Sequence, residues 1–526
     1  MRVLRYRRPV THDDQTSEPT PITVKAAGRG GVAIAGAKIY FILLGLVQQV
    51  VLKHILGLQN YGALGRVQSV ASVVYNPIVS TSVQGVSRAV SSAADEDREA
   101  TTRRVLGIHG VAILPVALLF FLGAPTIAIA IGAPHLTLAL RIVSGVLFFY
   151  GLYTPLVGVL NGQKRFGAQA ALDALFASLR TVGLLAGAYY FAKRGAGVEG
   201  ALAGFVAAAC LILLIALPIA GLGRAGRGGT SVRQHLAFLA PLLGGQLALN
   251  LLFQCDLTLL GRFAADAAQT ARLPVTEADT LAGAYRNAQL FCFLPYQLLL
   301  SITFVLFPML ATAKRDGDTA AVARYTTTGV RLALIIAGAM VSVTASLPQG
   351  LLTLVFGQDS AALGSSAMSV LALGLGSFAI FGILATVLTS LGREKLSAAL
   401  TCVALALVVT MCFIQVRGQP FGPDMLLRTA YATSAGLGLA TIMTAVAVRK
   451  VAGAIVGLAT VVRTALALGC CVGMGRALGE LGKLQTLAAA AGIGLVYLLL
   501  LVATRELTRK DLELIRGVMG RGQRSA

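Results

Sequence analysis

The sequence is poor in charged side chains. Asp, Glu, Lys and Arg make up 13% of its 526 residues, about half of the roughly 25% that is usual for soluble domains. Hydrophobic residues make up 56%. Apolar stretches of about 20 residues recur along the whole chain, and each is long enough to cross a hydrocarbon core of roughly 30 Å. The shortage of charge therefore excludes a soluble globule and predicts a polytopic membrane protein.

Several motifs are also missing. The sequence contains no G-x-x-x-x-G-K-[ST] phosphate loop, so we expect no ATP use by this chain. Its seven cysteines include no C-x-x-C pair and lie in apolar stretches, where small hydrophobic side chains are their usual role. The longest predicted outer connection, 261–280, leaves no room for a soluble catalytic domain. We therefore expect no enzyme activity, no metal site and no cofactor, apart from a coupling ion.

Acidic residues are half as frequent as basic ones, which gives a formal net charge of +22. No module that combines basic and aromatic residues is visible, so we expect no nucleic-acid partner. Fourteen spans place both termini on one side, and 29 of the 44 lysines and arginines then lie on that side against 11 on the other. Because positive charge gathers in cytoplasmic loops, the count predicts a bacterial inner membrane protein with both termini in the cytoplasm.

The predicted fold is an all-α bundle, since no stretch alternates like a membrane β-strand. The polar ends 1–30 and 504–526 are predicted to be cytoplasmic tails, and the first contains no apolar stretch typical of a signal peptide. Helices 1–6 would form an N-lobe (31–220), helices 7–12 a C-lobe (221–447), and two more helices would follow (448–503). The fourteen apolar segments are 31–52, 67–87, 105–131, 142–160, 168–192, 198–220, 236–260, 281–312, 332–347, 365–391, 397–415, 429–447, 451–475 and 484–503.

An internal repeat supports the two lobes. The connection "VLNGQKRFGAQAAL" (159–172) is similar to "VLTSLGREKLSAAL" (387–400), with predicted turns at Gly162 and Gly392. The segment "GALGR" (62–66) is similar to "GAYR" (283–286), and each precedes a helix with a proline. Both pairs are six helices apart. Such repeats build transporters whose substrate site lies between the lobes and whose motion is rocking.

Several of these segments resemble polysaccharide flippases. "LGLQNYG" (56–62) resembles their first turn, "STSVQGVSRAVS" (80–91) the end of their second helix, and "CDLTLLGRF" (255–263) the end of their seventh. "GVEGALAGFVAA" (197–208) and "LTRKDLELIRG" (507–517) are similar to their sixth helix and closing basic helix. These proteins belong to the multidrug/oligosaccharidyl-lipid/polysaccharide exporter superfamily.

The resemblance implies two six-helix lobes in a V that work by alternating access. It implies a lipid-linked oligosaccharide as substrate, surrounding membrane lipids, polysaccharide polymerase machinery as a partner, and Na⁺ or H⁺ as the coupling ion. Within the superfamily, fourteen helices point to flippases of lipid-linked sugars, whereas drug exporters usually have twelve. The resemblance does not separate O-antigen, capsule, exopolysaccharide and lipid II as substrates.

A diphosphate carried through a membrane needs a hydrated cavity and cations, and ionisable residues inside membrane helices are functional candidates. Arg180 lies about twelve residues into its predicted helix, roughly 18 Å deep, and either lines the cavity or pairs with Asp173. Lys38 lies in the first span, where it either lines an entry or extends to the cytoplasmic surface. Gln49, eleven residues further, shares its helix face.

Helix 7 carries three amides at four-residue spacing, which places them in one stripe. Gln246, Asn250 and Gln254 either bind a polar ligand or hold helices together. Asp256 follows them and is a candidate coupling or gate acid, with Arg286 of helix 8 as its potential partner. Asn76 precedes a helix-breaking proline and completes the substrate-cavity candidates.

Three functions compete. The favoured one is a flippase that moves undecaprenyl-diphosphate-linked glycan across the inner membrane. The alternative is a cation-coupled drug antiporter of the same superfamily, which would need a buried acid and an aromatic site, whereas the deep charges here are mainly cationic and aromatics make up only 6%. A membrane glycosyltransferase, polymerase or ligase would need a large outer loop or clustered acids and histidines, and neither is visible.

Overall fold

The computed structural model describes residues 21–226, 230–479 and 481–507, without the side chains of residues 21–39 and of Phe304. Within these ranges every regular element is a helix. The elements are α1 (Pro21–Ser92), η1 (Asp95–Asp97), α2 (Arg98–Ala130), η2 (Pro134–Leu136), α3 (Thr137–Gly162), α4 (Phe166–Ala192), α5 (Gly197–Ala220), α6 (Val232–Thr270), α7 (Glu277–Cys292), α8 (Leu294–Arg315), α9 (Thr319–Ser346), α10 (Pro348–Phe356), α11 (Gln358–Ser390), α12 (Glu394–Gln415), α13 (Asp424–Ala452), α14 (Leu458–Ala477) and α15 (Lys483–Ala503).

The helices account for fourteen membrane spans. Twelve helices of the described chain are long and apolar enough to cross a membrane. Helices α7 and α8 together make a further span, in which the part Glu277–Thr303 is bent by 41° relative to the part Val305–Arg315. Helix α1 is interrupted at Gly57, whose φ of 74° and ψ of 168° are not helical. Its part from Tyr40 to Ser92 has 53 residues, more than twice the roughly 20 that one span needs, so α1 contributes two spans. The predicted all-α membrane fold is confirmed.

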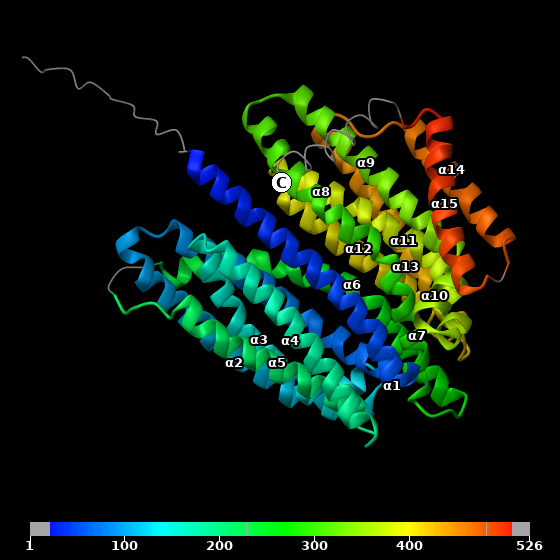
Figure 1. Cartoon of the computed structure of the whole chain (residues 1–526), viewed down its shortest axis with the longest axis horizontal. Coiled ribbons are helices and arrows are strands. Elements are labelled where there is room, and N and C mark those ends of the chain that lie inside the picture. The colour runs from blue at the N-terminus through cyan, green and yellow to red at the C-terminus, as the bar shows by residue number, and fades with distance from the viewer. Residues whose placement is uncertain (1–20, 227–229, 480, 508–526) are drawn as a thin grey trace, which may run out of the picture.

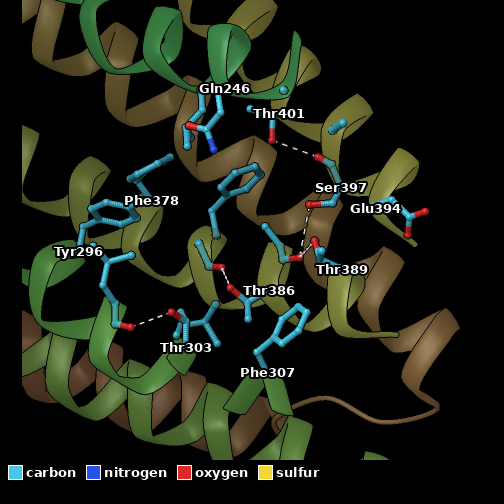
Figure 2. A pocket seen from close by; sticks show the side chains of 18 of the residues that line it. Gln246, Tyr296, Thr303, Phe307, Phe378, Thr386, Thr389, Glu394, Ser397 and Thr401 are labelled. Carbon is cyan, nitrogen blue, oxygen red and sulfur yellow. Dashed lines mark hydrogen bonds between the residues drawn. The ribbon is translucent and has the colours of Figure 1, made fainter. Parts of the chain in front are cut away.

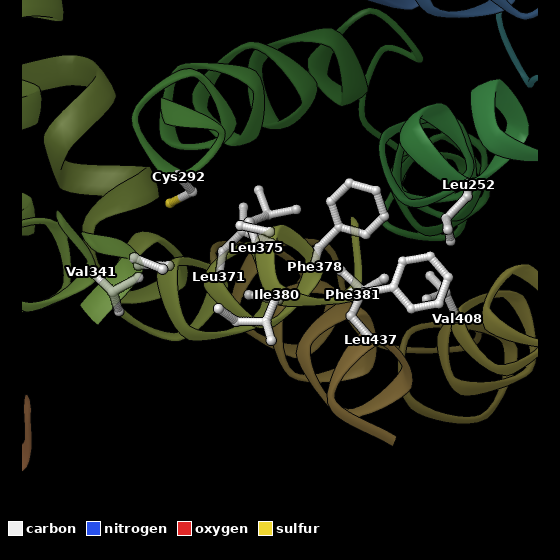
Figure 3. Packing of buried hydrophobic residues seen from close by; sticks show 14 of the residues in the cluster. Leu252, Cys292, Val341, Leu371, Leu375, Phe378, Ile380, Phe381, Val408 and Leu437 are labelled. Atoms are coloured by element: carbon white, nitrogen blue, oxygen red, sulfur yellow. The ribbon is translucent and has the colours of Figure 1, made fainter. Parts of the chain in front are cut away.

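The spans form two lobes, each with its own hydrophobic core. One core joins α1 to α5, and the other joins α6 to α15. In Figure 1, α2–α5 and α9–α15 lie on opposite sides, with the first part of α1 running between them. Helix α11 is central to the C-lobe, where its Leu371, Phe378 and Phe381 pack against neighbouring helices (Figure 3). The predicted limits of the lobes, 220 and 447, stay a prediction.

The repeated connections have the same backbone geometry. Lys164 and Gly392 occupy matching positions, with φ of 59° and 74°. In both turns the next residue donates its N–H to the carbonyl five residues back, from Arg165 to Leu160 and from Arg393 to Leu388, each at 2.9 Å. The predicted turn at Gly162 is wrong. Gly162 ends α3, and a Cβ there would lie 2.8 Å from the Ser87 carbonyl oxygen, so glycine allows close helix packing there.

The second repeated pair meets at the contact between the lobes. Gly62 of α1 and Gly283 of α7 pack against each other, and a Cβ on Gly62 would lie 1.8 Å from the Asp279 carbonyl oxygen. A Cβ on Gly283 would lie 2.5 Å from the Leu58 carbonyl oxygen. Equivalent glycines of the two lobes thus let their backbones touch. This end of the bundle, which holds Gly57, η2 and the α6–α7 connection, is called the Gly57 end below.

Helices α14 and α15 contribute to the core of the C-lobe and pack on α9. After α15, Glu506 is 3% exposed and accepts hydrogen bonds from Arg331, Thr460 and Arg463 at 2.9, 2.9 and 3.2 Å. These contacts fasten the end of α15 to α9 and α14. The predicted tail segments 1–20 and 508–526 lie outside the described residues.

Candidate functional site

A polar cavity of about 270 Å³ lies between the lobes. Its walls come from α1, α4 and α5 of the N-lobe and from α6, α7 and the junction of α7 with α8 at Phe293 in the C-lobe. Eleven of the seventeen lining residues carry an amide, a hydroxyl or a guanidinium group. The lining residues are Gln48, Gln49, Gln68, Ser69, Ser72, Tyr75, Asn76, Arg180, Leu184, Phe205, Phe253, Gln254, Leu257, Arg286, Gln289, Leu290 and Phe293.

Arg180 brings a charge into this cavity from the middle of α4. Its guanidinium lies 4.3 Å from the centre of the Phe41 ring, and its Nε is buried without a hydrogen-bond partner. A Cβ on Gly45 would lie 3.7 Å from a terminal guanidinium nitrogen of Arg180, so the facing part of α1 leaves room for this side chain. Among the described residues, Arg180 forms no ion pair.

Arg286 reaches across the lobe interface from α7 to α1. It donates to the Gly65 carbonyl at 3.0 Å and to the side-chain oxygens of Gln68 at 2.7 Å and Gln49 at 3.5 Å. A Cβ on Gly65 would lie 2.8 Å from Arg286 Cδ, so glycine makes space for the arginine. All these acceptors are neutral, and in the described chain Arg286 has no carboxylate partner.

The structure brings five of the eight predicted cavity residues together. Gln49, Asn76, Arg180, Gln254 and Arg286 all line the polar cavity.

The other three candidates lie elsewhere or are not described. Gln246 lines a different, apolar pocket of the C-lobe. Asn250 is buried and donates to the Gln246 carbonyl at 2.8 Å. The helix 7 amides therefore do not face a single cavity. The side chain of Lys38 falls outside the described residues.

The wall that α1 gives to the polar cavity contains several residues that were not predicted from the sequence. Gln68, Ser72 and Tyr75 line the cavity with Asn76, and their spacing of three or four residues places them on one helix face. This polar stripe is the sequence pattern that could have predicted the α1 wall of the cavity. Its hydroxyls also join the lobes, because Ser69 Oγ lies 3.1 Å from Thr258 Oγ1 of α6.

Asp256 lies inside the C-lobe, 3% exposed. Its carboxylate accepts hydrogen bonds from Tyr285 at 2.9 Å, Gln289 at 3.0 Å and Thr433 at 3.3 Å. Within the described chain Asp256 and Arg286 form no ion pair, contrary to the pairing considered from the sequence. Asp256 reaches the cavity indirectly, through Gln289, which lines it.

The ion pair between the lobes lies instead at the Gly57 end. Arg66 of α1 and Asp279 of α7, 2% and 1% exposed, are 2.6 Å apart. Arg66 also donates to the Ile131 carbonyl, and His135 Nε2 lies 2.7 Å from the second oxygen of Asp279. All three residues lie between the predicted spans and were not singled out as candidates, because nothing in their local pattern shows that distant turns meet and bury them.

A second contact closes the same end. Lys53 of α1 lies 2.6 Å from Asp359 at the start of α11 and donates to the Phe356 carbonyl. The Gly57 end is therefore tightly joined by glycines and compensated charges. The polar cavity differs, because in the described part of the chain its two guanidinium groups contact neutral partners only. Cations in a low-dielectric site without counter-charges favour an anionic ligand, and the surrounding amides and hydroxyls can bind hydroxyl groups.

Comparisons with known proteins agree with this architecture. The lipid II flippase MurJ, in an inward closed conformation, is similar over 91% of this chain and 100% of its own, with a TM-score of 0.71 and 15% identity. An inward-facing multidrug resistance MATE family transporter of the MOP superfamily matches over 78% of this chain and 94% of its own, with a TM-score of 0.66 and 16% identity. A MOP superfamily transporter from Pyrococcus furiosus matches over 82% of this chain and 96% of its own, with a TM-score of 0.59 and 16% identity.

These likenesses establish the fold. The curated protein sequences contain no significant match to the chain. A family model described as "Polysaccharide biosynthesis protein" matches residues 27–314, a little over half of the chain. The chain therefore belongs to this family of polysaccharide biosynthesis proteins.

Proposed function

We propose that this membrane protein is a flippase for undecaprenyl-diphosphate-linked glycan units. It would take the unit from the cytoplasmic leaflet of the bacterial inner membrane and release it to the outer leaflet, for O-antigen or another surface polysaccharide. The observation that carries the proposal is the pair of uncompensated arginines, Arg180 and Arg286, in a polar cavity between two lobes. The family's link to polysaccharide biosynthesis supports the same substrate class.

The mechanism follows from the position of the cavity. The lobes meet tightly at the Gly57 end. The opposite end of the bundle carries the excess of positive charge, which supports a cytoplasmic position for that opposite end and for both termini. In this state the diphosphate would bind the guanidinium groups and the sugars would bind the amides of Gln49, Gln68 and Gln254. Rocking of the lobes would separate Gly62 from Gly283 and open the cavity outward.

The energy source and the partners belong to the same proposal. Asp256, bonded to the cavity residue Gln289, is the candidate for sensing Na⁺ or H⁺. The polymerase machinery that uses the flipped glycan is the expected partner, and the chain itself would make no covalent bond. A drug antiporter is disfavoured because Arg180 and Arg286 would repel the cationic compounds that such exporters carry.

The test is surface glycan in cells that depend on this protein. Arg180→Ala is expected to abolish surface glycan, because the diphosphate loses a cation in a low-dielectric cavity, while the protein still inserts at normal levels. Arg194→Ala is the matched control, since Arg194 lies in the turn two residues after the same helix, is exposed and also lies over a phenylalanine ring, 5.9 Å from its centre. Normal glycan display by Arg180→Ala would show that the cavity is not the substrate site.

A further inference from the structure

A second, larger cavity lies inside the C-lobe. It has a volume of about 610 Å³ and lies between α6, α8, α11 and α12. Figure 2 shows Tyr296, Phe307 and Phe378 around it, together with several hydroxyl side chains. Most of its lining surface is apolar, and its size is that of a typical small-ligand site, roughly 300–1,000 Å³.

The threonine and serine hydroxyl groups of this pocket already donate hydrogen bonds to the backbone. Thr303 donates to the Leu300 carbonyl at 2.7 Å, Thr386 to Gly382 at 2.9 Å and Thr389 to Ala385 at 2.8 Å. Ser397 and Thr401 likewise donate to backbone carbonyls, at 3.3 and 3.0 Å. Because their protons are bound to backbone carbonyls of α8, α11 and α12, these side chains present mainly carbon atoms to the cavity. The other polar lining residues are Gln246, Tyr296, and Glu394 and Lys395 of the first turn of α12. The rest of the lining suits a hydrocarbon and not a sugar.

One layer of aromatic rings separates this apolar pocket from the polar cavity. Phe253 lines the polar cavity, and its ring centre lies 5.5 Å from that of Tyr296 and 5.2 Å from that of Phe378. Tyr296 and Phe378 line the apolar pocket. A cationic site for an anion thus adjoins a site for a hydrocarbon. A ligand that fits both must carry a phosphate group directly attached to a long apolar chain.

We propose that this C-lobe pocket binds the hydrocarbon chain of the transported lipid, in the part next to its diphosphate. The inference rests on the proposed function for the identity of the lipid. It adds that the protein recognises the chain as well as the head group, so that transport depends on chain length. A substrate whose chain is too short to reach past Phe253 would lose this binding energy.

Two neighbouring glycines of α6 provide the test. Gly245 lines the pocket, Gly244 is exposed and does not line it, and a Cβ at either would meet no atom within 4 Å. Both tolerate a side chain, and replacing a helical glycine favours the helix. Gly245→Phe would fill the pocket with a ring, whereas Gly244→Phe would place the same ring outside it.

The experiment uses the full chain in proteoliposomes with a polyprenyl diphosphate that carries a photoreactive group on its first isoprene units. We expect cross-links to α6, α8, α11 and α12, reduced about tenfold in Gly245→Phe, which corresponds to about 1.4 kcal/mol of binding. The yield in Gly244→Phe should stay within about twofold of wild type. Thermal unfolding of both purified variants verifies that they fold.

Equal cross-linking in the two variants, or cross-links only to other helices, would overturn the inference. So would equally effective competition by phosphatidylglycerol, since the pocket would then hold an ordinary acyl chain. Cross-linking reports occupancy and needs no transport. A wild-type protein that is cross-linked in the pocket but moves no lipid would overturn the proposed function alone, and one that moves lipid without these cross-links would overturn the pocket alone.

Discussion

Arginines lie at two regions of the lobe interface, buried at one and half-buried at the other, and their surroundings differ. At the Gly57 end, Arg66 pairs with Asp279 at 2.6 Å and His135 shares the same carboxylate. In the polar cavity, Arg180 lies over the Phe41 ring and Arg286 donates to a carbonyl and two amides. Among the described residues, the charges of the first region are balanced, whereas the two arginines of the second have no counter-charge.

This difference separates a structural role from a binding role. A buried ion pair with its hydrogen bonds satisfied holds its two helices in one arrangement, because separating the charges leaves each unpaired in a low-dielectric medium. A buried cation with neutral partners gains free energy when an anion arrives. Arg66 is therefore expected to stabilise the closed Gly57 end, and Arg180 and Arg286 to bind the substrate.

The largest stability effect is predicted at the Gly57 end. Arg66→Met should lower the free energy of unfolding by roughly 3–5 kcal/mol, because it leaves Asp279 buried without its cation. Thermal unfolding of the purified protein in detergent measures the change. The double variant Arg66→Met with Asp279→Leu removes both charges and should recover most of the loss. If the double variant is as unstable as the single one, charge pairing is not what stabilises this contact.

A smaller and opposite stability effect is predicted in the cavity. Arg180→Gln and Arg286→Gln should change the free energy of unfolding by no more than about 1 kcal/mol, or increase it, since each removes a half-buried charge that has no counter-ion in the described part of the chain. The same unfolding measurement applies. A loss as large as that of Arg66→Met would mean that the cavity arginines are structural, and the distinction between the two regions would fail.

The smallest effect is predicted at the end of α15, where the partners of Glu506 are partly exposed. Burial alone would raise the pKa of Glu506, but hydrogen bonds from Arg331, Thr460 and Arg463 outweigh it and hold the pKa below its usual value. A lowered pKa means that this contact stabilises the protein above the usual pKa and is lost as the pH falls through the lowered one. The difference in melting temperature between wild type and Glu506→Gln should thus be largest near neutral pH and vanish in acid. A difference that is constant with pH would contradict this.

The sequence predicted the spans because their hydrophobicity is a local property, and it located Arg180 because a charge in an apolar run is conspicuous. It missed the Arg66–Asp279 pair because both residues lie at span ends, where charges are ordinary. Their burial depends on two glycines, Gly62 and Gly283, that let distant helices touch. The turn residue Lys164 was also missed, because a positive φ at lysine has no compositional signal.

The helix 7 amides show the limit of periodicity. Gln246 and Gln254 share a helix face, but they line two different cavities. Helical spacing fixes which side chains lie above one another and does not reveal what packs between them. Phe253 and its aromatic neighbours form that partition, and their contacts come from α6, α8 and α11 together.

The most direct test of the account is transport by the purified protein. Proteoliposomes with a fluorescent undecaprenyl-diphosphate glycan, and a membrane-impermeant quencher outside, would report movement of the lipid between leaflets. Wild type and the control variant Arg194→Gln should move the lipid, whereas Arg180→Gln, folded and inserted, should not. Undiminished movement by Arg180→Gln would contradict the claim that the uncompensated cavity arginines bind the diphosphate.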